Sequence, residues 1–176
     1  STIWVWDRSY DTYASLFGGS ILYRPDCVQS VGTVNFDLNR LSAEVTALQK
    51  VEPQVGILYS DASRVYSSAY MAHVYSAYQG ILENGQKAGF VKESQIEKLS
   101  NYKMIIIPDC INIKKSTLDA VKNYADNGGK IIILGENSLK KDELNRPHDT
   151  AIVNDIFQKA QIIPTQSEGI KLTAPT

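Results

Sequence analysis

The stretch that decides the fold is KMIIIPDC, residues 103–110, in which an apolar run ends in a proline, a carboxylate and a thiol. Four consecutive apolar residues, Met104 to Ile107, are typical of a strand that is buried on both faces of a parallel sheet. The polar end of such a strand matters, because open α/β sheets bind ligands outside the carboxyl ends of their strands. Asp109 and Cys110 are therefore the first candidates for a functional site.

Similar apolar runs lie on both sides of this stretch, at Val55–Tyr59 (VGILY) and Lys130–Leu134 (KIIIL). Helical patterns alternate with these runs, which favours a parallel sheet covered by helices on both faces. We therefore predict a three-layer α/β/α domain with a central parallel sheet and a flavodoxin-like architecture. The strands near 55–59, 103–107 and 130–134 should be parallel neighbours in the middle of that sheet.

The other expected elements rest on shorter signals. One long helix over 64–83 should begin at a cap formed by Asp61 or Ser63. A second helix should begin at a Ser116 cap and end at Asn127-Gly128-Gly129, since glycine tolerates the left-handed conformation there. We also expect a strand at Phe90-Val91, a helix over 150–159, and a fifth, edge strand at either 162–163 or 170–172.

Residues 1–53 lack this regular alternation and are expected to differ in role from residues 54–176. Ile3–Trp6 indicates a short strand, Gly18-Gly19 a break, and Pro25 a turn or helix start. Leucines and a valine at helical spacing predict an amphipathic helix over 37–49, which Pro53 would end.

Composition excludes several classes of partner. The 176 residues are 43% hydrophobic and 21% charged, a normal balance for one globular domain. A formal net charge of −1 favours neither nucleic acid nor an anionic membrane. No apolar run approaches the roughly 20 residues of a membrane span. The first residues do not resemble a signal peptide, which favours the cytoplasm, while a secreted parent protein stays open.

Cys110 can act as a nucleophile only if a base or cation activates it. The two histidines are His73, which the expected helix places below or beside the strand ends, and His148, in a polar loop that could reach them. Asp109 should raise the pKa of the neighbouring thiol and so disfavour the thiolate. We expect a half-buried, unreactive cysteine, with a Cys110–His148 hydrolase or amidotransferase-like enzyme as the alternative.

A third hypothesis is a small-molecule site at the rim formed by the strand ends. Its residues would be Ser60, Asp61, Asp109 and Asn137. In the turn after the expected strand at 130–134, Ser138 lacks the flanking glycines of a nucleophile elbow. No glycine-rich phosphate loop follows the expected strand at 55–59. No Cys/His spacing typical of metal sites occurs, so we expect neither a metal nor a cofactor.

Tyrosines on the first long helix are the least ordinary feature. Tyr66, Tyr70, Val74 and Tyr78 follow a four-residue spacing, so the three tyrosines should line one stripe of a single helix. Tyrosine is enriched in interfaces because it joins a large apolar body to a polar tip. The stripe is either an interface for assembly or one side of a wide core face.

Three segments carry a resemblance to a known family: PQVGILYSDASRVYSSAY (53–70), LSNYKMIIIPDC (99–110) and STLDAVKNYADNGGKIIILGENS (116–138). Together they resemble the trimerisation domain that follows the catalytic barrel in family 42 β-galactosidases and related glycoside hydrolases. That domain has a class I glutamine amidotransferase-like fold without the catalytic machinery. The resemblance covers residues 54 to about 138.

The resemblance implies a non-catalytic structural or oligomerisation module. Amidotransferases carry their cysteine in the turn after the strand that corresponds to Lys130–Leu134, where this chain has Gly135-Glu136-Asn137. Cys110 belongs to the preceding strand, so the amidotransferase chemistry does not carry over. Residues 1–53 would be a connector from a preceding barrel, residues 54–176 the amidotransferase-like domain, and the parent a homo-oligomeric glycoside hydrolase.

Overall fold

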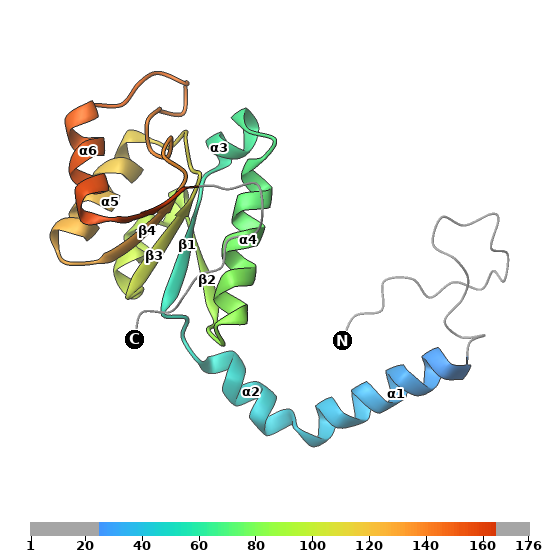
Figure 1. Ribbon diagram of the computed structural model, residues 1–176. Coiled ribbons are helices and arrows are strands. Elements are labelled where there is room, and N and C mark those ends of the chain that lie inside the picture. The colour runs from blue at the N-terminus through green and yellow to red at the C-terminus, as the bar shows by residue number, and fades with distance from the viewer. Residues whose placement is uncertain (1–24, 165–176) are drawn as a thin grey trace, which may run out of the picture. The chain divides into compact units, whose positions relative to one another are not determined.

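The computed structural model describes residues 25–164, and the chain divides into two compact units between Val51 and Glu52. The second unit, Glu52–Thr176, is called the α/β unit below. It contains every strand of the described residues (Figure 1). The strands expected at Ile3–Trp6 and at 170–172 lie outside the described residues, as does the break expected at Gly18-Gly19.

The α/β unit is built on one five-stranded sheet in which all neighbouring strands run parallel, in the order β2-β1-β3-β4-β5. This confirms that the three apolar runs are parallel neighbours at the centre, and that the candidate at 162–163 forms a strand. The strands are β1 (Val55–Tyr59), β2 (Ala88–Lys92), β3 (Met104–Pro108), β4 (Lys130–Leu134) and β5 (Gln161–Ile163).

Helices cover both faces of the sheet, which confirms the α/β class and is consistent with the three-layer prediction. Helix α4 lies on one face, and α5 and α6 lie on the other (Figure 1). A 3-10 segment, η2, follows β2. The bounds are α3 Asp61–Tyr66, α4 Tyr70–Glu83, η2 Glu93–Asn101, α5 Lys115–Asp126 and α6 Thr150–Lys159.

Burial on both faces explains why the central strands are continuously apolar. Ile57, Ile106 and Ile133 are at most 1% exposed, and backbone pairing sets Ile57 beside Ile106. Near the start of β1 and of β2, Gly56 and Gly89 are paired in register. Together they leave room for the ring of Tyr102. A Cβ atom added to Gly89 would lie 2.5 Å from the Tyr102 hydroxyl oxygen, so glycine here lets the ring lie directly against the strand.

The single helix expected over 64–83 is wrong, because the structure has two helices there. α3 ends at Tyr66, and Ser67 takes an extended conformation before α4 begins at Tyr70. The cap of α3 is Ser60, whose side chain accepts a hydrogen bond from the Ser63 amide, and neither Asp61 nor Ser63 serves as the cap.

The start of α5 also differs from the prediction. Lys114, and not Ser116, is the N-cap residue, and its side chain makes no capping bond. The carboxylate of Glu93, from η2, accepts hydrogen bonds from the Lys114 amide at 2.8 Å and the Thr117 hydroxyl at 2.9 Å. A carboxylate is favourable there because the helix N-terminus carries a partial positive charge. The expected helix end at Asn127-Gly128 is confirmed, with Gly128 at φ +81°.

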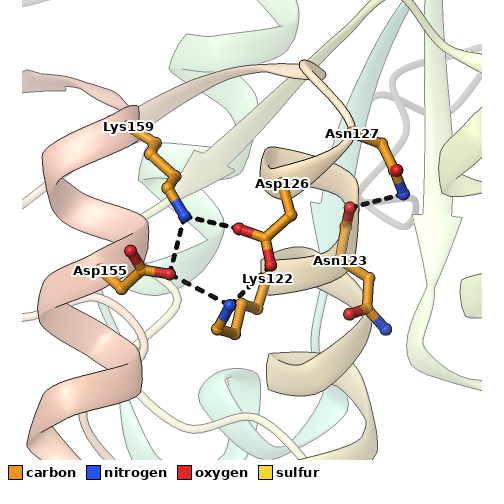
Figure 2. Close-up of polar contacts among 6 residues, drawn as sticks. All are labelled: Lys122, Asn123, Asp126, Asn127, Asp155 and Lys159. Carbon is orange, nitrogen blue, oxygen red and sulfur yellow. Dashed lines mark hydrogen bonds and ion pairs between the residues drawn. The ribbon is translucent and has the colours of Figure 1, made fainter.

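A cluster of four charges joins α5 to α6 (Figure 2). Lys122 Nζ lies 2.6 Å from Asp126 and 3.2 Å from Asp155, and Lys159 pairs with the same two carboxylates. Hydrogen bonds from the lysines lower the pKa of Asp126 and of Asp155. The cluster therefore contributes stability above the carboxyls' ordinary pKa of 3.8, and this is lost as the pH falls through the lowered values.

In the first unit, the described residues form helices α1 (Pro25–Arg40) and α2 (Ser42–Lys50), which together bury no residue. Pro25, expected at a turn or a helix start, is the first described residue and lies in α1. The prediction of one continuous helix over 37–49 is wrong, because Leu41 (φ −98°, ψ 22°) separates α1 from α2. Across residues 25–164, no helix combines the length and apolar character needed to cross a membrane.

Candidate functional site

The carboxyl ends of β1 and β3 are closed by a buried network of hydroxyl and backbone groups. The Ser60 and Ser63 hydroxyls each lie 2.7 Å from the Asn112 carbonyl oxygen, and the Asn112 amide donates to Ser63 Oγ at 2.9 Å. All three residues are at most 2% exposed. The Asn112 side chain in turn donates to the Asp142 carbonyl and to Asn145. The space in which this architecture commonly binds ligands is thus filled by the chain's own polar groups.

Tyr70 is part of the same network. Its hydroxyl accepts from the Ser60 amide at 2.9 Å and lies 3.4 Å from the Leu58 carbonyl, to which it can donate. The residue is 0% exposed. Of the two interpretations of the tyrosine stripe, the core face is correct for Tyr70. Its assignment to an assembly interface is wrong, because a side chain with no exposed surface cannot contact another subunit.

Cys110 lies beneath this network and is 0% exposed. Its sulfur is 3.6 Å from Ser63 Oγ and 3.8 Å from the Tyr70 hydroxyl. Burial raises the pKa of the thiol to about 12, although hydrogen bonds with Ser63 and Tyr70 oppose the rise. The expected direction of the pKa shift is correct, but its main cause is desolvation and not the charge of Asp109.

Cys110 should react slowly with alkylating reagents. The thiolate is the nucleophile, and burial both disfavours ionisation of the Cys110 thiol and keeps the reagent from its sulfur. We therefore expect iodoacetamide at about pH 8 to modify Cys110 at least about 100-fold more slowly than free cysteine. Mass spectrometry of the Cys110 peptide after timed exposure of the folded chain measures this rate. The half-buried Cys27 on α1 is the internal control for reagent quality. Modification of Cys110 at the rate of a free thiol contradicts the assignment.

His148 does not serve Cys110 as a base. Its Nε2 lies 2.9 Å from the carbonyl oxygen of Ile113, and its own amide donates to the Lys140 carbonyl. Since a carbonyl only accepts hydrogen bonds, Nε2 carries the proton in this contact. His148 anchors the loop after β4, and the Cys110–His148 pair of the enzyme hypothesis is not formed.

His73 is the histidine that reaches the end of β3, contrary to its expected place below or beside the rim. Its Nδ1 lies 3.2 Å from Asp109 Oδ2, although the alignment is not that of a hydrogen bond. Asp109 has a positive φ of 45°, and its amide donates to the Leu134 carbonyl at 2.7 Å. Gly135, at φ +88°, leaves room for this carboxylate, since an added Cβ would lie 2.5 Å from Asp109 Oδ1. This arrangement connects α4 to the ends of β3 and β4.

The four residues expected at a binding rim do not form one pocket. Ser60 is buried and fully engaged, whereas Asp61 and Asn137 are exposed. Asn137 accepts a hydrogen bond from Lys140, and Asp109 faces His73. Within residues 25–164, no group of three or more His, Cys, Asp or Glu side chains is placed to hold a metal ion.

The remaining tyrosines of the expected stripe lie on different elements. Tyr66 is 52% exposed on α3, and Tyr78 is half-buried on α4, where its ring stacks on Phe90 of β2 at a centroid distance of 6.0 Å. Tyr75, one helical turn from Tyr78, is 64% exposed. Sequence periodicity missed this residue as a surface candidate because it assumed one continuous helix from Tyr66.

Comparison with known proteins gives one family and several solved structures. Residues 43–160 match the family model of the β-galactosidase trimerisation domain. The crystal structure of the apo exo-carrageenase GH42 from Bacteroides ovatus is 26% identical, with a TM-score of 0.71 over 93% of this chain and 22% of that chain. A comparison with curated proteins finds no match.

Two other solved structures share the fold at lower identity. A catalytic mutant of Gan42B, a GH42 β-galactosidase from G. stearothermophilus, is 20% identical, with a TM-score of 0.63 over 82% of this chain and 22% of that chain. The β-galactosidase from Bacillus circulans sp. alkalophilus is 16% identical, with a TM-score of 0.60 over 80% of this chain and 22% of that chain. This chain therefore spans about a fifth of the length of these structures.

Proposed function

Because the match covers residues 43–160, the chain belongs to the β-galactosidase trimerisation domain family, and we propose that it is a non-catalytic assembly module of a larger family 42 glycoside hydrolase. The larger polypeptide that contains this chain is called the parent below. Residues 1–53 connect the module to a preceding catalytic barrel, and the α/β unit contributes to contacts between subunits.

The filled strand ends carry the non-catalytic part of this proposal. The thiol that could act as a nucleophile is 0% exposed, with a pKa raised to about 12, and His148 is engaged elsewhere. The turn Gly135-Glu136-Asn137 presents no nucleophilic thiol or hydroxyl. Among the described residues, nothing at the rim combines an accessible nucleophile with a base, as covalent catalysis requires.

The solved structures support the proposed parent. In each of them the match spans only 22% of the longer chain, and these proteins are an exo-carrageenase and two β-galactosidases. We assign the parent to the same class, a glycoside hydrolase whose catalytic acids belong to the barrel and not to this chain. Cys110→Ala in the parent is then expected to leave the rate of glycoside hydrolysis unchanged, because the buried thiol takes no part in the reaction.

Sedimentation of two proteins tests the assembly role. We expect the parent to be oligomeric, and the 176-residue chain alone to be monomeric or weakly associated. The reason is that a stable interface buries on the order of 1,200–2,000 Å² in total, more than a few exposed aromatic side chains supply, so the barrel must add the remainder. Sedimentation velocity over a concentration series measures both. A parent that sediments as a monomer contradicts the assembly role.

A further inference from the structure

An open groove of about 550 Å³ lies along the exposed side of α4, between α3 and the edge strand β2. Its floor and walls are mostly aromatic and aliphatic, and the Tyr78–Phe90 stack joins the helix to the strand across it. The apolar lining consists of Tyr59, Met71, Val74, Tyr75, Tyr78 and Phe90.

The groove leaves a contiguous apolar surface in water. Tyr75 is 64% exposed, Phe90 44% and Met71 43%, and they line the same hollow. Contiguous apolar patches of this kind usually mark interaction sites, whereas single exposed apolar residues need no explanation. Tyrosine, phenylalanine and methionine are also the residue types enriched in protein interfaces.

β2 adds a second unpartnered feature beside the groove. It is the end strand of the described sheet, paired on one side with β1 and with no further strand among residues 25–164. An edge strand offers unpaired backbone groups to an approaching chain. β2 therefore borders the groove as an edge strand that, among the described residues, is open to pairing with an approaching chain.

The charges at the rim favour an asymmetric contact. The charged residues that line the groove are two cations, Arg64 and Lys92, and one carboxylate, Asp61. The rim therefore carries a net positive charge. Arg64 also donates to the Tyr59 hydroxyl at 3.3 Å, which holds its guanidinium over the groove wall. A ring of three subunits joins one face of each subunit to a different face of the next, and a face with one predominant charge suits a complementary face better than a copy of itself.

We propose that this groove receives a surface of a second copy of the chain in the assembled parent. The proposal rests on the proposed assembly role and specifies the face that the role uses. The surface that enters the groove on the neighbouring subunit carries apolar side chains beside at least one carboxylate, which pairs with Arg64 or Lys92. Tyr75, at the most exposed position of the apolar lining, is the central anchor.

A charge placed in the groove tests this proposal. In the parent, Tyr75→Arg and Phe90→Arg should each weaken subunit association by about 30-fold or more, as expected when a charge replaces an interface anchor. The matched control is Leu144→Arg in the loop after β4, because Leu144 is 62% exposed and lies outside the groove. Sedimentation velocity measures association. If the groove variants assemble like Leu144→Arg in an oligomeric parent, the groove is wrong while the assembly role stands.

A second experiment identifies the occupant without changing the charge. The photoreactive residue p-benzoylphenylalanine replaces Tyr75, and parent subunits labelled with ¹⁵N are mixed and reassembled with unlabelled ones before irradiation. We expect crosslinked peptides that combine both labels, which only contact between two copies can produce. Crosslinks confined to a single label, within one subunit, overturn the proposal. A wild-type parent that is monomeric overturns the assembly role itself.

Discussion

Tyr70→Ala is expected to lower the free energy of unfolding of the chain by about 3–5 kcal/mol, the range for deleting a large aromatic side chain from a core. The ring is 0% exposed, and the backbone around it cannot fill the space that it leaves. The substitution also removes the acceptor of the Ser60 amide, which is buried. Urea denaturation followed by circular dichroism measures the loss. Tyr70→Phe, which removes the hydroxyl alone, should cost about 1–3 kcal/mol.

Tyr75→Ala is the matched control on the same helix. Tyr75 is 64% exposed, so its removal from the isolated chain should change the free energy of unfolding by no more than about 0.5 kcal/mol. The two variants compare the loss of stability at a core position and at a surface position of the same helix, α4. Equal losses for Tyr70→Ala and Tyr75→Ala would show that Tyr70 is not packed in the core as described.

Alkaline pH should destabilise the chain through Cys110. The thiol has an ordinary pKa of 9.0, which burial raises to about 12 in the folded protein. Between these values the unfolded chain releases the thiol proton while the folded chain retains it. Raising the pH therefore favours unfolding, and the stabilisation present below pH 9.0 is lost progressively as the pH rises toward about 12. The loss amounts to about 2 kcal/mol at about pH 10.5 and approaches about 4 kcal/mol near pH 12.

Cys110→Ala isolates this effect from the other alkaline titrations. Burial, and Cys110 beside it, raise the pKa of Tyr70, so the difference between the two proteins reports Cys110 together with its effect on Tyr70. Urea denaturation of both proteins at about pH 8 and about pH 10.5 gives the change in their difference. We expect wild type to lose about 2 kcal/mol more than Cys110→Ala between these pH values. Equal losses would mean that Cys110 is solvated in the folded chain.

The sheet could be predicted from the sequence because its central strands are buried on both faces. Met104–Ile107 and Lys130–Leu134 have no polar side chain within their apolar cores, and only a parallel sheet covered on two sides needs such runs. Glycines at the end of α5 made that helix boundary equally clear. These signals are local, so one sequence was sufficient to interpret them.

The break between α3 and α4 could not be predicted in the same way. Residues 64–83 keep a helical spacing of apolar side chains through Ser67, and serine alone does not end a helix. The break follows from the tertiary requirement that Ser63 reach Asn112 while Tyr70 reaches Ser60, contacts that join distant parts of the chain. The predicted tyrosine stripe failed for this reason.

The candidate site shows the same division between local and distant information. The sequence placed Cys110 at the end of a central strand and predicted an unreactive thiol. It did not show that Ser63 and Asn112 cover the sulfur, or that His73 and not His148 approaches the strand end. Both facts depend on how α3, α4 and the loop after β4 pack over the sheet. The capping of α5 by Glu93 is likewise a contact across 21 residues.

The strand order also has a consequence for the time course of folding. No two neighbouring strands of the described sheet form a hairpin, so every pairing must wait for a crossover segment to be made and closed. β1 is synthesised first yet lies between β2 and β3, and its second edge stays unpaired until residues near 108 have emerged. Such non-local pairings slow folding and prolong the exposure of apolar edges. A growing chain therefore remains open to wrong strand partners until its central strands have met.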